Sequence, residues 1–154
     1  DLMATHLRTQ VRRAVKAALE GLPPTGPRVF LGRTWPLEEA EFPALLVYAR
    51  GGVYRVDAQS DDDAGRPFER DERLIVEGVV RTKGEEPDDT LDRIEAEVAA
   101  ALLASAAVGT LVEIREPVSS EIAARATGES REGSIKLVFR IVNRSPAGDL
   151  TTKV

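Results

Sequence analysis

Apolar residues near the start of the chain recur every three or four positions, and this spacing predicts an amphipathic helix over residues 3–22. Leu7, Val11, Val15 and Leu19 fall on one side, with basic residues between them. Thr5 is the expected N-cap. A Gly-Leu-Pro-Pro string then ends the helix, because proline cannot continue its hydrogen bonding.

Strands are predicted through the middle of the chain, from the β-branched and apolar runs there. A short strand is expected over 28–33, a strand buried on both faces over 44–49, an extended segment over 53–57 and a long strand over 68–83. Residues 60–67 are polar and rich in turn formers, so we expect them to form the mobile tip of a long β-arm.

The rest of the chain predicts a second helix followed by three strands. The helix starts at Asp88 or Asp89, whose charge suits the helix dipole, and runs to about Ser105. Strands are expected over 110–116, with Val112 and Ile114 pointing inward, and over 119–127. A final strand places four apolar residues on one face: Ile135, Leu137, Phe139 and Ile141.

This element order predicts an α+β fold, in which a mostly antiparallel sheet carries two helices on one face and a long β-hairpin arm. The 154 residues suit one domain, expected over 1–146, with 147–154 as a flexible C-terminal tail. Hydrophobic residues make up 42% and charged residues 31%, the composition of a soluble folded protein. Neither a membrane-spanning run nor a secretory signal is evident, so a cytoplasmic origin is expected.

The residues that usually carry catalysis are scarce. Cysteine is absent, which excludes disulfides, thiolate metal sites and thiol nucleophiles, and His6 is the only histidine. The acidic runs 61–63 and 85–89 lack calcium-loop spacing and read as solvated turns. No phosphate loop or nucleophile elbow occurs, so no catalytic residue, metal or cofactor is predicted. A carboxylate pair acting in hydrolysis stays open.

Charge and shape favour association with proteins over nucleic acid. The formal net charge of −5 repels DNA, which argues against sequence-specific DNA binding. A small domain with a polar arm and exposed strand edges is a plausible subunit of a symmetric assembly. A monomer with a disordered hairpin tip is the alternative, and these observations do not choose between them.

Several strings, in order, resemble the tail terminator family of long-tailed phages, to which minor tail protein U of lambda-like phages belongs. They are Leu7-Arg8-x-x-Val11 in the first helix, Gly32-Arg33 after a strand, an acidic loop running into Phe42-Pro43-Ala44, the strand Leu45-Leu46-Val47-Tyr48, and then Gly52 and Tyr54. Similar proteins serve phage-derived gene transfer particles. Beyond about residue 55 the resemblance lies in the order of elements.

The resemblance implies a structural virion protein that is not an enzyme. Such proteins form a ring, usually a homohexamer, on the head-proximal end of the tail tube. The ring stops tube polymerisation and offers the joining surface for the head–neck connector or stopper protein. DNA would pass through the lumen unread, no membrane is involved, and assembly takes place in the bacterial cytoplasm.

Exposure arguments then give the candidate interface residues. Trp and Arg are enriched at interfaces, arm residues can pair with partners of either charge, and the second hairpin tip is exposed. The candidates are Arg33, Trp35, Tyr54, Arg55, Asp61, Asp62, Asp63, Arg66, Arg70, Glu129, Ser130 and Arg131. Another neck or tail-tube component, or a small ligand-binding or hydrolytic domain, remains the alternative function.

Overall fold

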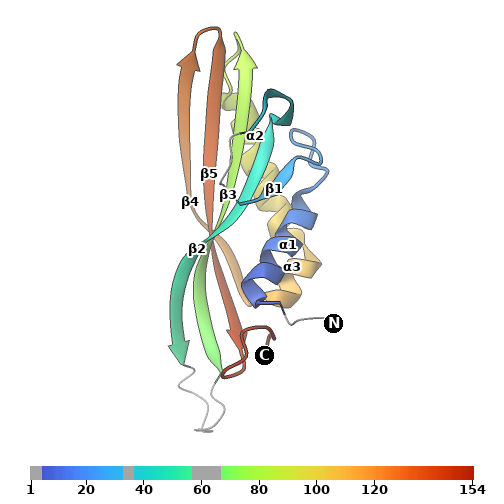
Figure 1. Ribbon diagram of the computed structural model, residues 1–154, viewed down its shortest axis with the longest axis vertical. Helices are drawn as coiled ribbons and strands as arrows, with labels where there is room; N and C mark the ends of the chain where they lie inside the picture. Colours follow the sequence, from blue (N-terminus) through green and yellow to red (C-terminus); the bar gives the residue numbers. More distant parts are fainter. Residues whose placement is uncertain (1–4, 33–36, 57–66) are drawn as a thin grey trace.

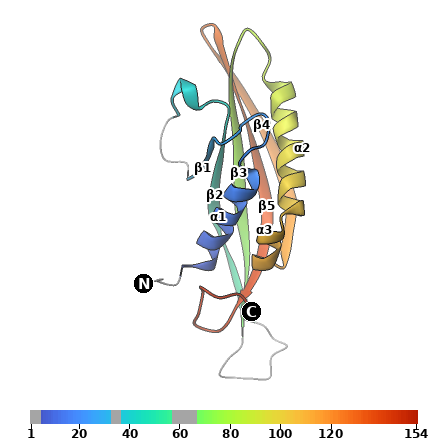
Figure 2. The same cartoon turned by 90° about the vertical axis from the view of Figure 1, so that its right-hand side faces the viewer.

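The computed structural model describes residues 5–32, 37–56 and 67–154. Within them a five-stranded sheet in the order β1-β2-β3-β5-β4 carries helices on one face, as Figures 1 and 2 show. The elements are α1 (Leu7–Leu19), β1 (Val29–Leu31), the short 3-10 helix η1 (Glu39–Glu41), β2 (Ala44–Val56), β3 (Phe68–Lys83), α2 (Asp88–Ala104), α3 (Ala106–Leu111), β4 (Ile114–Thr127) and β5 (Ser130–Ser145). The predicted α+β class is confirmed.

Strands β3 and β5 form the backbone of the sheet. They pair antiparallel without a break, from Phe68 opposite Ser145 to Lys83 opposite Ser130. β2 and β4 flank this pair in antiparallel orientation, and the short β1 runs parallel to β2. The sheet is therefore long along its strands, and its two ends lie far apart (Figure 1).

The core lies between the helices and one face of the sheet. The inward row of β5 is buried as predicted, and the buried residues of α2 are Leu91, Ile94, Val98 and Leu102. The helix lies close to the sheet because glycines stand beneath it. A Cβ on Gly78 would lie 2.9 Å from Ile94 Cγ2, and one on Gly133 would lie 2.8 Å from Pro87 Cγ.

Two pairs of predicted strands are single bulged strands. β2 continues through a bulge between Arg50 and Gly52, and β4 continues through one between Pro117 and Ser119. A bulge inserts an extra residue while the pairing resumes beyond it. At Gly52 the backbones approach closely, since an added Cβ would lie 2.3 Å from the carbonyl oxygen of Asp71.

A third helix replaces the start of the strand predicted over 110–116. The Ser105 hydroxyl accepts a hydrogen bond from the backbone N–H of Val108 (3.2 Å) and caps α3, which extends to Leu111. Val112 is buried as expected. Ile114 is not inward, because it stands opposite Val142, outside the inward row of β5, and is 36% exposed.

The chain ends pack together, and the N-cap of α1 differs from the predicted Thr5. The backbone N–H of Leu7 donates to Leu150 O (2.8 Å), that of Val154 donates to Arg144 O (3.0 Å), and the N-cap is His6. Gln10 Nε2 adds a bond to Thr151 O (2.7 Å). The first N–H groups of a helix lack partners within it, and the C-terminal segment supplies a carbonyl to one of them.

Candidate contact surfaces

The base of the predicted arm is the end of the sheet where β2 and β3 continue beyond the bulge. Tyr54 is 52% exposed there, and its ring meets that of Phe68 edge-on, with centroids 6.5 Å apart. Arg55 is also exposed. β5 pairs with β3 up to Phe68, so this base is three strands wide and held on both sides of β3.

Arg70 does not belong to this exposed surface, which corrects the prediction. Its side chain is 1% exposed, and its Nε and Nη2 donate to Asn143 Oδ1 over 3.2 and 3.0 Å. Glu72 lies beside it, 3.8 Å from Nε, and also binds Arg8 Nη2 over 2.6 Å. Side chains alternate along a strand, so Arg70 and Glu72 share the helix-covered face with Leu74.

Some candidate contact residues lie outside the described part of the chain. These are Arg33, Trp35, Asp61, Asp62, Asp63 and Arg66. They stay predictions. The strands on either side of residues 57–66 are β2, which ends there, and β3, which begins there, and these strand ends lie at the end of the sheet below α1 (Figure 1).

The tip of the β4–β5 hairpin is at the opposite end of the sheet (Figure 1). Gly128 supplies the positive φ of 59° that the turn needs, and Glu129 follows it, exposed. Ser130 begins β5 opposite Lys83, and Arg131 forms an ion pair with Glu86 in the loop that leads to α2. The three tip candidates therefore lie together, beside the β3–α2 loop.

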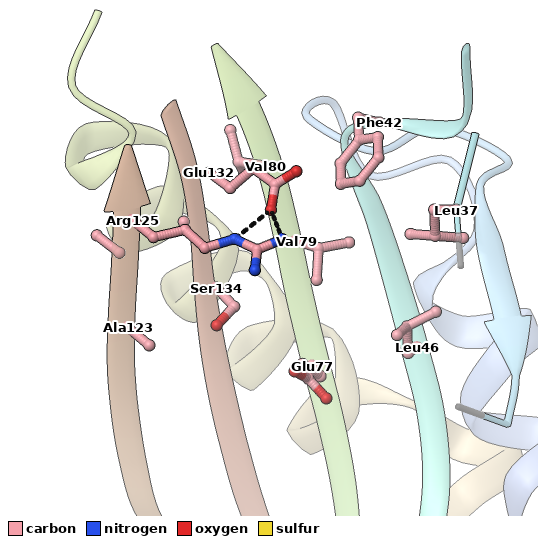
Figure 3. A pocket seen from close by; sticks show the side chains of 12 residues that line it. Leu37, Phe42, Leu46, Glu77, Val79, Val80, Ala123, Arg125, Glu132 and Ser134 are labelled. Carbon is pink, nitrogen blue, oxygen red and sulfur yellow. Dashed lines mark hydrogen bonds and ion pairs between the residues drawn. The ribbon is translucent and has the colours of Figure 1, made fainter. Parts of the chain in front are cut away.

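A hollow on the helix-free face of the sheet was not predicted from the sequence. Figure 3 shows it between the loop before β2 and the end of β4. Arg81 lies over the Phe42 ring, 4.4 Å from its centroid, and binds the Glu132 carboxylate. Arg125 binds the same carboxylate from β4, with Nε 2.9 Å from Oε2. These two hydrogen-bonded arginines, Arg81 first, lower the pKa of Glu132.

A sequence signal for this hollow did exist. Arg125 and Glu132 stand symmetrically about the turn at Gly128, so a hairpin there places them opposite each other. Arg81 has no such local signal, because it is 51 residues from Glu132 in the sequence.

The same face carries a second ionic group nearer the arm. Asp71 binds Arg140 Nε over 3.0 Å and Arg73 Nη1 over 2.7 Å, and Arg140 also reaches Glu116 over 3.1 Å. The hydrogen bond from Arg140 is the main cause that lowers the pKa of Asp71. The carboxylates of Asp71 and Glu132 are therefore held ionised by arginines of the same chain, which suits neither of them for proton transfer near neutral pH.

Two features are absent from the part of the chain that the structure describes. Across 5–32, 37–56 and 67–154, no three His, Asp or Glu side chains gather closely enough to bind a metal ion. None of the helices described there has the length and apolar character needed to cross a bilayer.

Comparison with known proteins gives a family match over most of the chain. The family described as phage minor tail protein U matches residues 6–142. Among solved structures, a chain from the virion of a native gene transfer agent particle aligns over 94% of this chain and 100% of that chain, with 14% sequence identity and a TM-score of 0.46. No curated protein matches the sequence significantly.

Proposed function

The chain belongs to the phage minor tail protein U family, and from this membership we propose that it is the tail terminator of its particle. Membership makes it a structural component of the virion tail and not an enzyme. The proposal adds the specific task, which is to cap the head-proximal end of the tail tube as a ring, usually a hexamer in such proteins, and to present the surface that the head–neck connector or stopper protein joins.

The observation that carries the proposal is the difference between the two ends of the sheet. The arm end presents Tyr54 and Arg55, an aromatic and a basic side chain. The hairpin end is predominantly acidic, with the exposed residues Glu38, Glu39, Glu85, Glu86, Asp88, Asp89 and Glu129 near Lys83 and Arg131. A terminator needs two such unlike ends, because it must bind the tube on one side without offering a second tube-binding surface on the other.

The net charge fits a ring through which DNA passes without being read. A chain of net charge −5 gives DNA no general attraction. The ionic groups of the helix-free face are paired with one another, as in Arg81 with Glu132 and Arg140 with Asp71. Partners would therefore be proteins: further copies of the chain, the tube protein and a neck protein.

The proposal is tested by assembling particles without the wild-type protein and supplying variants of it in its place. Without the protein we expect overlong tubes and free heads. A variant of the arm end, Arg55→Glu with Tyr54→Ser, and a variant of the hairpin end, Arg131→Glu, should fail at different steps. One should leave overlong tubes, and the other should leave tubes of regular length without heads.

Electron microscopy of the lysates distinguishes these outcomes. Ala96→Ser serves as the control, since Ala96 is exposed in the middle of α2, lies at neither end of the sheet and should support normal particles. Normal particles from both end variants would overturn the assignment of the ends. Wild-type protein found in stacked rings along the whole tube would favour a tail-tube component instead.

A further inference from the structure

The exposed large apolar side chains of the described residues lie almost entirely along the two opposite edges of the sheet. Val154, at the C terminus, and Leu103, on helix α2, are the exceptions. One edge has Leu31 on β1 with Val53 and Tyr54 on β2, and the other has Ile114, Val118 and Ile122 on β4. Apolar surface gathered at particular places on a soluble protein marks sites of association.

Helix α2 widens the apolar surface on the β4 side. Ala99 lines a shallow groove with Val118 and Pro117, and Leu103, one helical turn further on, is 48% exposed. We use the name β4 flank for Leu103, Ile114, Val118 and Ile122. The name β2 flank is used for Leu31, Val53 and Tyr54.

Both flanks also present strand edges. β4 is the last strand of the sheet, and no described strand pairs with its outer edge. The outer edge of β2 is covered by β1 only opposite Leu45–Val47, and among the described residues no strand covers it from Ala49 onward. Long open edges are normally blunted or paired, because their N–H and C=O groups template association.

The strand directions allow one flank to meet the other. β2 and β5 run one way, and β3 and β4 run the opposite way. When copies stand side by side around an axis parallel to the strands, β4 of one copy meets β2 of the next in antiparallel orientation. The alternation within the sheet then continues across the boundary between copies.

Charge complements this arrangement. The β2 side carries the exposed arginines Arg50 and Arg55, and the β4 side carries the exposed acids Glu113, Glu116 and Glu121. Opposite charges on the two sides favour β2 against β4 and disfavour β4 against β4.

We propose that the β4 flank of one copy binds the β2 flank of the next copy, and that this single head-to-tail contact builds the ring. The inference rests on the proposed terminator function and adds to it the surfaces that join the subunits. Two different surfaces at opposite edges form a heterologous interface, which closes into a ring when the rotation between copies allows it.

Cysteine cross-linking tests the contact directly, because the chain has no cysteine of its own. Val53→Cys, Val118→Cys and the double variant are treated with a short bis-maleimide, both free in solution and on tail tubes. The double variant should give a ladder of oligomers that ends in one closed species. An equal mixture of the two single variants should stop at dimers, and each single variant alone should stay monomeric.

The control is a double variant of Val118→Cys and Val154→Cys. Val154 is 53% exposed but belongs to neither flank, so this control should give no ladder of oligomers. Dimers formed by Val118→Cys alone would overturn the proposal in favour of a symmetric edge-to-edge contact. Rings of wild-type protein on tube ends without a ladder from the double variant would overturn this interface while leaving the terminator function standing. Failure of the wild type to bind tube ends at all would overturn both.

Discussion

The guanidinium of Arg70 lies against the side-chain amide of Asn143, with Nε and Nη2 3.2 and 3.0 Å from Oδ1 and both side chains buried. The pair joins β3 to β5 at the root of the arm, below the first turn of α1. Glu72 and Arg8 extend it to the helix. A charged residue next to a candidate contact surface therefore serves the stability of the fold.

Replacing Arg70 by alanine should lower the free energy of unfolding by about 3 kcal/mol, because the buried Asn143 oxygen and the nearby Glu72 carboxylate lose a partner. The exposed Arg55→Ala should change it by less than about 0.5 kcal/mol. Urea unfolding of the two variants measures the contrast. Equal small effects would show that the Arg70 cluster is not a stabilising element.

Gly52→Ala should destabilise the protein by at least about 2 kcal/mol, since the new Cβ would meet the Asp71 carbonyl and the strands would have to separate. The neighbouring Gly51→Ala is the matched control, because a Cβ there meets nothing within 4 Å. Chemical denaturation of both variants tests this. A Gly51 variant as unstable as the Gly52 variant would point to backbone conformation as the cause and not to the close approach.

His6 should make stability depend on pH. Its Nδ1 accepts a hydrogen bond from the backbone N–H of Arg8 (2.9 Å), which only the neutral ring can do at that atom. Partial burial, and then Arg70 and Arg8, lower the pKa of His6 below its ordinary 6.5. The cap is fully formed above that value, and its contribution is lost as the pH falls through the lower pKa of the folded state.

The variant His6→Asn keeps a capping acceptor that does not titrate. Between about pH 7 and pH 5, the wild type should lose up to about 1 kcal/mol of stability relative to this variant, the usual contribution of an N-cap. Urea unfolding at the two pH values gives the comparison. Parallel pH dependences would mean that His6 does not cap α1 in solution.

Glu132 should stabilise the folded protein at neutral pH but not at acidic pH. Its pKa is lowered, so its ion pairs with Arg81 and Arg125 are complete above its ordinary pKa of 4.5 and are lost as the pH falls through the folded-state value. Glu132→Gln should cost about 1 kcal/mol near pH 7, and the difference from wild type should shrink toward about pH 3. Glu129→Gln, exposed at the same tip, is the control. A pH-independent cost at Glu132 would show that packing and not charge matters there.

Much of the sheet follows from local pattern. The alternation from Ile135 to Ile141 was enough to predict β5 and its buried face, and the acidic start and apolar spacing were enough to predict α2. The bulge at Gly52 could not be predicted in this way, because its cause is the backbone of Asp71 on a neighbouring strand. Helix α3 is capped by one residue, Ser105. This helix was not predicted from the sequence, because the short apolar alternation that follows was interpreted as a strand.

The candidate contact surfaces could also be predicted only in part from the sequence. The exposure of Tyr54, Arg55 and the hairpin tip follows from their nearness to turns. Arg70 was misplaced although counting back in twos from the buried Leu74 puts it on the covered face. The pairing of Asp71 with Arg140, 69 residues apart in the sequence, appears only when the strand register is known.

The unbroken pairing of β3 with β5 also sets a length. Each strand has 16 residues, and at the usual rise of a strand this corresponds to roughly 50 Å between the arm root and the hairpin tip. No hinge interrupts that span, since every residue of β3 is in register with β5. The subunit is thus a stiff spacer: whatever binds one end is held at a fixed separation from whatever binds the other.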